Sequence, residues 1–494
     1  MNWQDVKKQW FFTFVFIFIA TFLLSIFAIG EEFQPPVAKV DKRIELLTIV
    51  FRLAGAEEFQ SQSVPRYTDE IDRHFAPFRD HKAIKYVREV LRRTGIGQNA
   101  VVNFGIHLTI DEGKVIFPDP SEKDLLRHLD PRWHLKLASR FAALLDDFYT
   151  TTGFHQFFEE HRVFYQSMEQ RFADISDSVD YSWFKDFYAT DYPGRFHIIL
   201  MPACDDGGFG AWCASQDSLA KPADQQRYVD NIYAFIGTEM TNQEGEPFYD
   251  KQIHAYLMVH EFNHSWCNPI VDKHFPQYED EIASIFAGVA KQMGSIAYGK
   301  PKIMTYEYFV RLADMDYAQK HFEDPAFARQ LQMRYRMLGF VHFDDLVPLL
   351  DQYAKNRDIY PTFDCFAPEI IQTLIDAEDS KPKIVEMVPP NHSTDVDPSL
   401  TCIHVTFDRP MSSGMAWCSS DLYPIFPLIV NPNPSWSEDG KTCTLAEISL
   451  KPNTTYNIWL NLGEHQSFQS VDEIPLPDTF YTFTTGSAKT EAEE

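Results

Sequence analysis

The chain has 494 residues, of which 45% are hydrophobic, so it is too long for one ordinary domain and can build large packed cores. Its 44 basic and 71 acidic residues give a formal net charge of −27 at pH 7. This balance argues against nucleic acid and anionic membrane surfaces as partners. We expect two or three folded units with a solvated acidic surface.

Residues 1–30 have the pattern of an export signal. Lys7 and Lys8 precede an apolar run over residues 10–29, which is followed by charged and turn-prone residues. The small residues near Gly30 permit cleavage, whereas twenty apolar residues could also stay as an uncleaved membrane anchor. Both alternatives predict an exported protein, periplasmic, at the cell surface or secreted, that touches a membrane only through this anchor.

The seven cysteines are an odd number without CxxC spacing, which indicates neither a structural zinc site nor a dense disulfide framework. Cys204 and Cys213 flank a glycine-rich stretch, residues 205–210, which we expect to be a flexible loop. The two thiols could form a disulfide in an oxidising compartment. Cys267 is more typical of a buried helix cysteine than of a metal ligand.

Helical periodicity dominates the chain after a proline-rich stalk. We expect helices over residues 43–53, 81–93 and 131–149, with Pro131 at the first helical position of the third, and a further helix after Gly153. Two short apolar runs, residues 196–201 and 232–237, predict strands. The second run is a candidate edge strand that would hold an extended peptide by main-chain hydrogen bonds, although an ordinary core strand fits it equally well.

A longer amphipathic helix is predicted to begin after Asp250, a suitable N-cap. Its apolar stripe falls at i, i+4, i+7 and i+11, on Ile253, Leu257, His260 and His264. The Asn-Pro pair at residues 268–269 predicts its end. Both histidines should therefore face the protein interior.

Residues 260–264 read His-Glu-Phe-Asn-His, an HExxH pattern. On a helix the imidazoles of His260 and His264 project from one face a turn apart, which suits two ligands of a tetrahedral Zn²⁺. Glu261 then lies beside the metal, where it could act as a general base toward a zinc-bound water. The alternative is a pair of core histidines hydrogen-bonded to backbone. That alternative is costly, because an inward His-Glu-His cluster is expensive to bury without a metal.

A catalytic zinc needs a third protein ligand. The candidates by distance along the chain are Glu279 and Glu281, which follow His264 closely, and the later Glu307. Spacing alone leaves the choice among these three open.

Helices are also expected over residues 282–293 and 306–320 and onward to about residue 377, where the polar residues 376–382 read as a linker. From residue 383 the period changes to two, which predicts a small all-β sandwich. Four segments, residues 388–391, 407–411, 451–456 and 483–486, resemble the bacterial Ig-like domains of cell-surface and S-layer-associated proteins. The resemblance covers residues 381–488 and implies a spacer or adhesion module that would contact a cell surface or glycan.

The chain resembles a family of uncharacterised bacterial zinc metallopeptidases, a domain of unknown function of the gluzincin type. The matching residues are 260–269, 306–311 and 360–366. With residues 43–47 and 104–108, the resemblance spans residues 37–378. It implies an α+β, mainly helical, zincin-like domain with a small β-sheet. It also implies that Glu307, in an ExxVR segment, is the third zinc ligand, with Glu281 as the alternative.

One departure concerns the residue four positions after the ligand glutamate. Thermolysin-like enzymes carry an aspartate there, and this chain has Arg311. Asp314 or a backbone carbonyl could orient an imidazole instead. Arg311 could hold the Glu307 carboxylate, a substrate carboxylate or an interhelix salt bridge. Tyr298 and Tyr306 are candidates for stabilising the transition state.

These patterns predict an exported zinc-dependent peptidase that hydrolyses peptide or protein substrates through a zinc-bound water, with Glu261 as general base. One alternative is a non-catalytic surface protein that binds or adheres and keeps a structural or vestigial metal site. Another is a zinc hydrolase of non-peptide amides.

Overall fold

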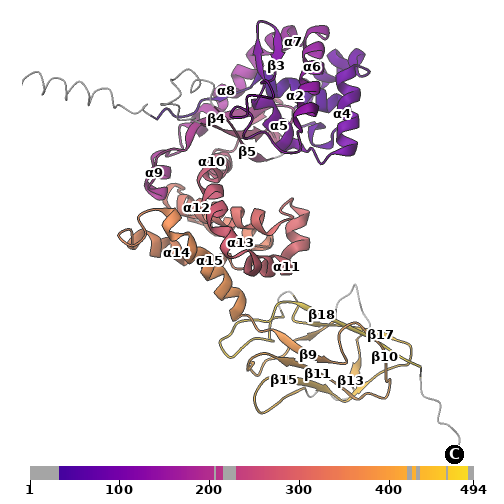
Figure 1. Ribbon diagram of the computed structural model, residues 1–494. Helices are drawn as coiled ribbons and strands as arrows, with labels where there is room; N and C mark the ends of the chain where they lie inside the picture. The colour runs from indigo at the N-terminus through magenta and orange to yellow at the C-terminus, as the bar shows by residue number, and fades with distance from the viewer. Residues whose placement is uncertain are drawn as a thin grey trace, which may run out of the picture. The chain divides into compact units, whose positions relative to one another are not determined.

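The computed structural model describes residues 33–204, 207–214, 230–419, 426–429, 434–462 and 465–487. The expected export segment, residues 1–30, lies outside the described residues. Among the helices that are described, none has the length and apolar character needed to cross a membrane. The protein is α+β and about half helical, and it divides into two compact units, the first built largely from residues before 272 and the second ending in a β-sandwich (Figure 1).

The first unit carries a group of helices, coloured indigo to purple in Figure 1. They are α2 (Lys42–Ala54), α3 (Pro65–Phe75), α4 (Lys82–Arg93), α5 (Gln98–Ile106), α6 (Leu135–Thr151), α7 (Phe154–Glu160), α8 (Arg162–Ser176) and α9 (Ser182–Tyr188). The expected helices are confirmed except at the start of α6. Pro131 lies in a turn before that helix, because the Asp130 carboxylate accepts the Arg132 N–H and its carbonyl accepts the Trp133 N–H.

A four-stranded sheet forms the centre of the first unit. It contains β1 (Ala38–Lys39), β4 (Gly194–Met201), β6 (Asp230–Gly237) and β5 (Gly208–Ala214), in the order β1-β4-β6-β5. The first three are parallel, and β5 is antiparallel to β6. Two short ribbons accompany the sheet, β2 (Thr109–Asp111) with β3 (Lys114–Ile116) and β7 (Met240–Thr241) with β8 (Pro247–Phe248).

This sheet corrects two expectations. Residues 232–237 are not an edge strand, since β6 pairs with β4 on one side and β5 on the other. Part of the expected glycine-rich loop is the start of β5, in which Gly208 pairs with Ile236 and Gly210 with Ala234. Within the part of the chain that is described, β5 is the edge next to β6. The glycines here mark a close approach of another element and not a flexible loop.

Cys204 and Cys213 are both buried and do not form the disulfide that the sequence left possible. The Cys204 thiol accepts a hydrogen bond from Gln98 Nε2 at 2.7 Å, and Cys213 lies 3.9 Å from the Tyr233 hydroxyl. Each sulfur is therefore engaged with a different neighbour.

The HExxH residues lie on α10 (Lys251–His274). Asp250 caps it, accepting the N–H groups of Gln252 and Ile253. The expected end of the helix at residues 268–269 is wrong, because the helix continues past Pro269 to His274. The side chains of Val271 and Phe275 beyond the proline are buried. Packing beyond the proline compensates for the one helical hydrogen bond that proline removes. Ile253 also departs from the expected inward stripe, with 47% of its surface exposed.

The remaining helices are α11 (Glu279–Ser295), α12 (Pro301–His321), α13 (Pro325–Met337), α14 (Phe343–Lys355) and α15 (Phe363–Ser380). Short 3-10 turns stand at Glu57–Phe59, Ala76–Phe78 and Phe275–Gln277. The expected linker over residues 376–382 is mostly the last turn of α15.

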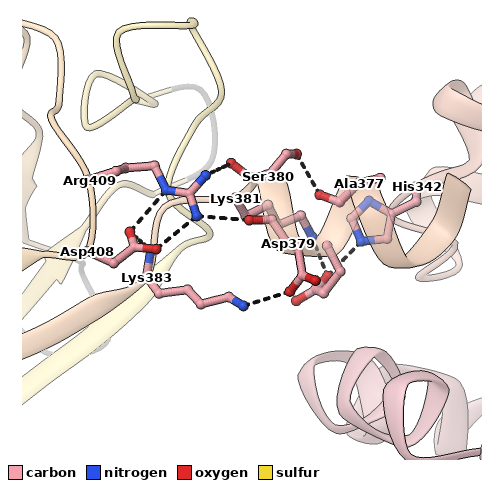
Figure 2. A network of polar contacts seen from close by, with 9 residues as sticks. His342, Ala377, Asp379, Ser380, Lys381, Lys383, Asp408 and Arg409 are labelled. Atoms are coloured by element: carbon pink, nitrogen blue, oxygen red, sulfur yellow. Dashed lines mark hydrogen bonds and ion pairs between the residues drawn. The ribbon is translucent and has the colours of Figure 1, made fainter. Parts of the chain in front are cut away.

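The end of α15 is held by polar contacts to residues next to the strands that follow it (Figure 2). Arg409 donates to the carbonyls of Ser380 and Asp379 at 2.6 and 2.8 Å and pairs with Asp408 at 2.8 Å. Lys383 bonds back to Asp379 at 3.0 Å. These bonds satisfy carbonyls that a helix leaves open at its C-terminus, so a polar sequence stays helical here.

The C-terminal region is a β-sandwich, as expected. One sheet has the order β10-β18-β17-β12 and the other β14-β15-β11-β9. Their strands are β9 (Ile384–Val388), β10 (Ser393–Val396), β11 (Cys402–Phe407), β12 (Trp417–Cys418), β14 (Ser435–Trp436), β15 (Thr442–Ala446), β17 (Thr455–Leu460) and β18 (Thr479–Thr485), with β13 (Leu428–Ile429) and β16 (Ile448–Ser449) as a separate pair. Ile403, Val405 and Phe407 are all buried in the core, as their alternation predicted.

Candidate metal centre

Three side chains from α10 and α12 form a group that could hold a metal ion. One ligand atom from each of His260, His264 and Glu307 lies within 4.8 Å of the other two. His260 and Glu307 are buried and His264 is half-buried. Glu279 and Glu281, the other candidate acids, are exposed in the first turn of α11. Glu307 is therefore the acid that the structure brings to the two histidines.

A hydrogen bond fixes the ring of His260. Its Nδ1 lies 2.7 Å from Oδ2 of Asp314, whose side chain is fully buried. A carboxylate accepts hydrogen bonds, so Nδ1 carries a proton, and in the neutral ring Nε2 then keeps its lone pair. An imidazole held in this way is oriented as metal-ligating histidines usually are.

The bond between Asp314 and His260 is supported by a chain of buried polar side chains. Asn263 Nδ2 donates to Oδ1 of Asp314 at 2.9 Å, and the Tyr188 hydroxyl donates to Oδ1 of Asn263 at 2.8 Å. Burial, followed by the neighbouring Cys267 thiol, raises the pKa of Tyr188 well above its usual value, so the phenol remains a donor. The Tyr188 oxygen lies 3.2 Å from the Cys267 sulfur, which completes the chain. Asp314 thus has both carboxylate oxygens engaged and cannot rotate freely.

His264 is oriented from within its own helix. Its Nδ1 lies 3.1 Å from Oδ1 of Asn268, four residues further along α10. An amide oxygen is an acceptor, so this histidine also donates through Nδ1 and leaves Nε2 for a metal. Two imidazole nitrogens and one carboxylate oxygen are the donor types of a catalytic zinc site. The donor set therefore fits zinc.

Glu261 is buried beside the edge strand β5. A methyl group built on Gly210 would lie 3.3 Å from Oε2 of Glu261 and 3.4 Å from its carbonyl oxygen. One built on Gly208 would lie 3.2 Å from Oε1 of Glu261 and 2.6 Å from Cδ2 of Leu257. The two glycines let the strand lie against the Glu261 carboxylate, and larger side chains would displace it.

The other expected site residues lie on or before α12. Arg311 is buried on that helix, one turn after Glu307. Tyr306 has the Lys302 ammonium 5.7 Å from its ring centre, and Tyr298 meets the ring of Phe340 edge-on at 6.3 Å. Neither geometry assigns the tyrosines a role at the metal centre.

Five supporting residues were not predicted from the sequence: Asn263, Asn268, Tyr188, Gly208 and Gly210. Two of them carried a local signal, because Asn268 stands at i+4 from His264 and Asn263 at i+3 from His260. The glycines, two residues apart, share one face of a strand, which their alternation could have shown. Tyr188 had no local signal, since it is 75 residues from Asn263.

Comparison with known families gives two matches, and no curated protein matches the chain. The model of a domain of unknown function, DUF4932, matches residues 37–373, which include every residue of this centre. The model of a bacterial Ig-like domain matches residues 378–485, which include the β-sandwich. Because the first match covers more than half of the sequence, the chain belongs to the DUF4932 family and ends in a bacterial Ig-like domain.

Proposed function

We propose that this protein is an exported zinc-dependent peptidase with a zincin-like helical domain. The observation that carries the proposal is the orientation of the two histidines in the group of three possible ligands. His260 and His264 each use Nδ1 for a hydrogen bond to a side-chain oxygen, and their group with Glu307 is compact. A pair of purely structural histidines has no need for such matched orientation.

Zinc would be held by Nε2 of both histidines and the carboxylate of Glu307, and when bound it would supply Lewis-acid chemistry at the peptide carbonyl and the attacking water. The protein's own part is to hold these ligands in place. Asp314 and Asn268 keep the imidazoles in the correct tautomer.

Glu261 would act as the general base. Its carboxylate takes a proton from the water as the water oxygen bonds to the peptide carbonyl carbon. The C–N bond then breaks, and the same carboxylate returns the proton to the leaving amine nitrogen. Its position against Gly208 and Gly210 limits its movement during both transfers.

The edge strand β5 would bind the substrate. It has β6 on one side and lies directly against Glu261. An extended peptide can add to such an edge through main-chain hydrogen bonds, which places its backbone near the base. We therefore assign substrate binding to β5 and not to residues 232–237. The Ig-like domain would serve as a spacer or adhesion module.

The test is digestion of a peptide library by the zinc-loaded protein and by its Glu261→Gln variant. We expect cleavage by the first, and a loss of about 10²–10⁴-fold in the second, because only the proton-transfer group is removed. Zinc content, measured by elemental analysis, should be equal in both. Cleavage at an unchanged rate by the variant would remove Glu261 from the mechanism.

Two further variants control for charge and for the ligand assignment. Glu279→Gln removes an exposed carboxylate from α11 and should leave activity unchanged. Glu307→Ala should lose zinc, whereas Glu281→Ala should retain it. Zinc held by all variants without any hydrolysis by the wild type would favour a structural metal site instead.

A further inference from the structure

Three buried polar side chains from three helices meet in the core of the first unit. They are Glu45 of α2, Tyr67 of α3 and Tyr165 of α8. The Tyr67 hydroxyl donates to Oε1 of Glu45 at 2.5 Å and lies 2.6 Å from the Tyr165 hydroxyl. Because the single hydroxyl proton of Tyr67 goes to Glu45, Tyr165 donates to Tyr67. This chain of hydrogen bonds joins the three helices, and nothing in the proposed peptidase mechanism uses it.

Glu45 is the member of this chain that changes its charge near neutral pH. Burial raises the pKa of its carboxyl to about 7, although the hydrogen bond from Tyr67 opposes this rise. Burial, followed by the Glu45 charge, raises the pKa of Tyr67 well above its usual value, so Tyr67 remains a donor. A phenol carries no positive charge, and an ionised carboxylate in a protein core is costly without one.

The helices packed around Glu45 bring few titratable groups to it. Among their buried side chains, those of α4 and α5 do not titrate, and α6 has one phenol, on Tyr149. The buried titratable groups of α3 and α8 are Tyr67 and Tyr165 themselves. At the end of α5, burial lowers the pKa of His107 to about 4, so this imidazole is neutral near pH 7. These helices therefore offer uncharged groups to the Glu45 carboxyl.

The charged groups of α2 and of the shorter elements beside it are paired or exposed. Each cation of α2 has an acid partner, in the pairs Arg52–Asp72, Lys42–Glu159 and Arg43–Asp41, with N···O distances of 2.9, 2.8 and 2.7 Å. The acids of the first 3-10 turn and of β2 are exposed, on Glu57, Glu58 and Asp111. The Tyr67 phenol is thus the group that the structure places against the Glu45 carboxyl.

A cavity of about 470 Å³ lies beside this chain, and Tyr67 is part of its lining. This Tyr67 cavity is also lined by Glu70 of α3 and by His161 between α7 and α8. His161 Nε2 lies 2.8 Å from Oε2 of Glu70, and Nδ1 lies 2.8 Å from the Phe157 carbonyl oxygen. Both nitrogens face acceptors, which only the doubly protonated ring satisfies.

Other charged groups of the Tyr67 cavity are on Arg66, Glu160 and Glu246. A cavity with such a polar lining and this volume can hold water molecules. It therefore gives α3 room to move and gives water a route to the side chain of Tyr67.

We propose that Glu45 is a proton-dependent latch on α3. As a neutral carboxyl it holds α3 against α2 and α8 through Tyr67, and its ionisation releases α3 toward the Tyr67 cavity, where water can solvate the charge. The pKa of Glu45 in the closed state, about 7, lies above its usual value of 4.5. The stabilisation of the closed state is therefore complete at low pH and is lost as the pH rises through 7. The latch is separate from the metal centre and from the proposed peptidase function.

The test is hydrogen–deuterium exchange of the full chain, read by mass spectrometry at pH 6 and pH 8 and corrected for the intrinsic effect of pH on exchange. We expect the opening equilibrium of α3 to increase by about tenfold between these pH values, given the two pKa values of Glu45. The helix α14 of the second unit is the internal reference and should keep its protection. Equal protection of α3 at both pH values would overturn the proposal.

Two variants assign the response to Glu45. Glu45→Gln keeps the acceptor for Tyr67 but cannot ionise, so α3 should have equal protection at pH 6 and pH 8. Tyr67→Phe should lower the protection of α3 by about two- to tenfold at pH 6, because it removes a buried hydrogen bond. It should also move the pH response upward, since the Tyr67 hydroxyl lowers the pKa of Glu45. This second variant tests the latch even where Glu45→Gln fails to fold, and circular dichroism checks both.

The matched control is Glu57→Gln, which removes an exposed carboxylate next to α2 and should keep the wild-type response. His161→Gln should also keep the tenfold change, because Glu45 still titrates in it. A response that persists in Glu45→Gln, or that only His161→Gln abolishes, would belong to another group and overturn the proposal.

Discussion

The two faces of the central sheet show how one set of strands supports two unlike surfaces. On one face β4 and β5 present Phe196, Gly208 and Gly210 to α10, and the helix comes so close that a methyl group on either glycine would meet the Glu261 carboxylate. On the other face the alternate residues, among them Arg195 and His197, line a basic cavity. Small and apolar residues permit close packing on the first face, while long cationic side chains line the cavity on the other.

The two faces also differ in how their residues are spaced along the chain. The proposed metal ligands His260 and His264 and the proposed base Glu261 lie within about one helical turn. The cationic lining gathers residues from Lys39 to Arg195, with Arg162 between them in sequence. A helix fixes the first arrangement locally, whereas only the packed fold creates the second.

The largest effect is expected for the variant Asp314→Asn. It removes the charge that holds His260 Nδ1, and we expect zinc affinity to fall by about 10–100-fold. Asp316→Asn is the matched control, because Asp316 is also buried on α12 but accepts from Trp183 at 2.8 Å. Competition with a zinc chelator measures both. A fall of equal size in both variants would contradict the role of Asp314.

A smaller effect is expected for Gly210→Ala. The added methyl group would lie 3.3 Å from Oε2 of Glu261 and push the carboxylate away from its position. We expect peptide hydrolysis to fall by about tenfold while zinc content stays constant, since only the base is misplaced. Gly207→Ala is the control, because nothing lies within 4 Å of its added carbon. Equal rates for the two variants would contradict the proposed contact.

The smallest effect concerns His107, which caps α5 between two residues of the cavity lining. Burial lowers its pKa to about 4, a hydrogen bond to the Asn103 carbonyl opposes this, and the charges of His128 and Arg43 add to it. The unfolded chain takes up this proton near pH 6.5, before the folded chain does. The contribution of His107 to the free energy of unfolding is therefore fully present above about pH 6.5. It is lost as the pH falls toward 4, because the unfolded chain binds the proton and the folded chain does not.

Between about pH 7.5 and about pH 5.5, the free energy of unfolding should fall by about 1 kcal/mol because of this histidine. Urea denaturation at the two pH values measures the change. His107→Gln should remove this part of the pH dependence, and His134→Gln, at an exposed position, should keep it. If the His107→Gln variant kept the wild-type pH dependence, burial would not hold His107 neutral in the folded protein.

Local patterns predicted the elements of the fold well. Patterns of residues near in sequence were enough to predict the Asp250 cap, the strand over residues 196–201 and the buried alternation of Ile403, Val405 and Phe407. The errors arose where a distant contact decided the outcome. The helix α10 continues past Pro269 because Val271 and Phe275 are buried, and α15 runs to Ser380 because Arg409 binds its last carbonyls (Figure 2).

The sequence by itself determined that His260 and His264 could bind one metal ion, since their helical spacing follows from backbone geometry, but it left the third ligand open. It also determined the period of the β-sandwich. Only the tertiary structure decided that Asp314 orients His260, that Gly208 and Gly210 mark an edge strand against Glu261, and that scattered cations line one cavity. The reason is physical: spacing within an element is set by backbone hydrogen bonds, but contacts between elements depend on how their side chains pack.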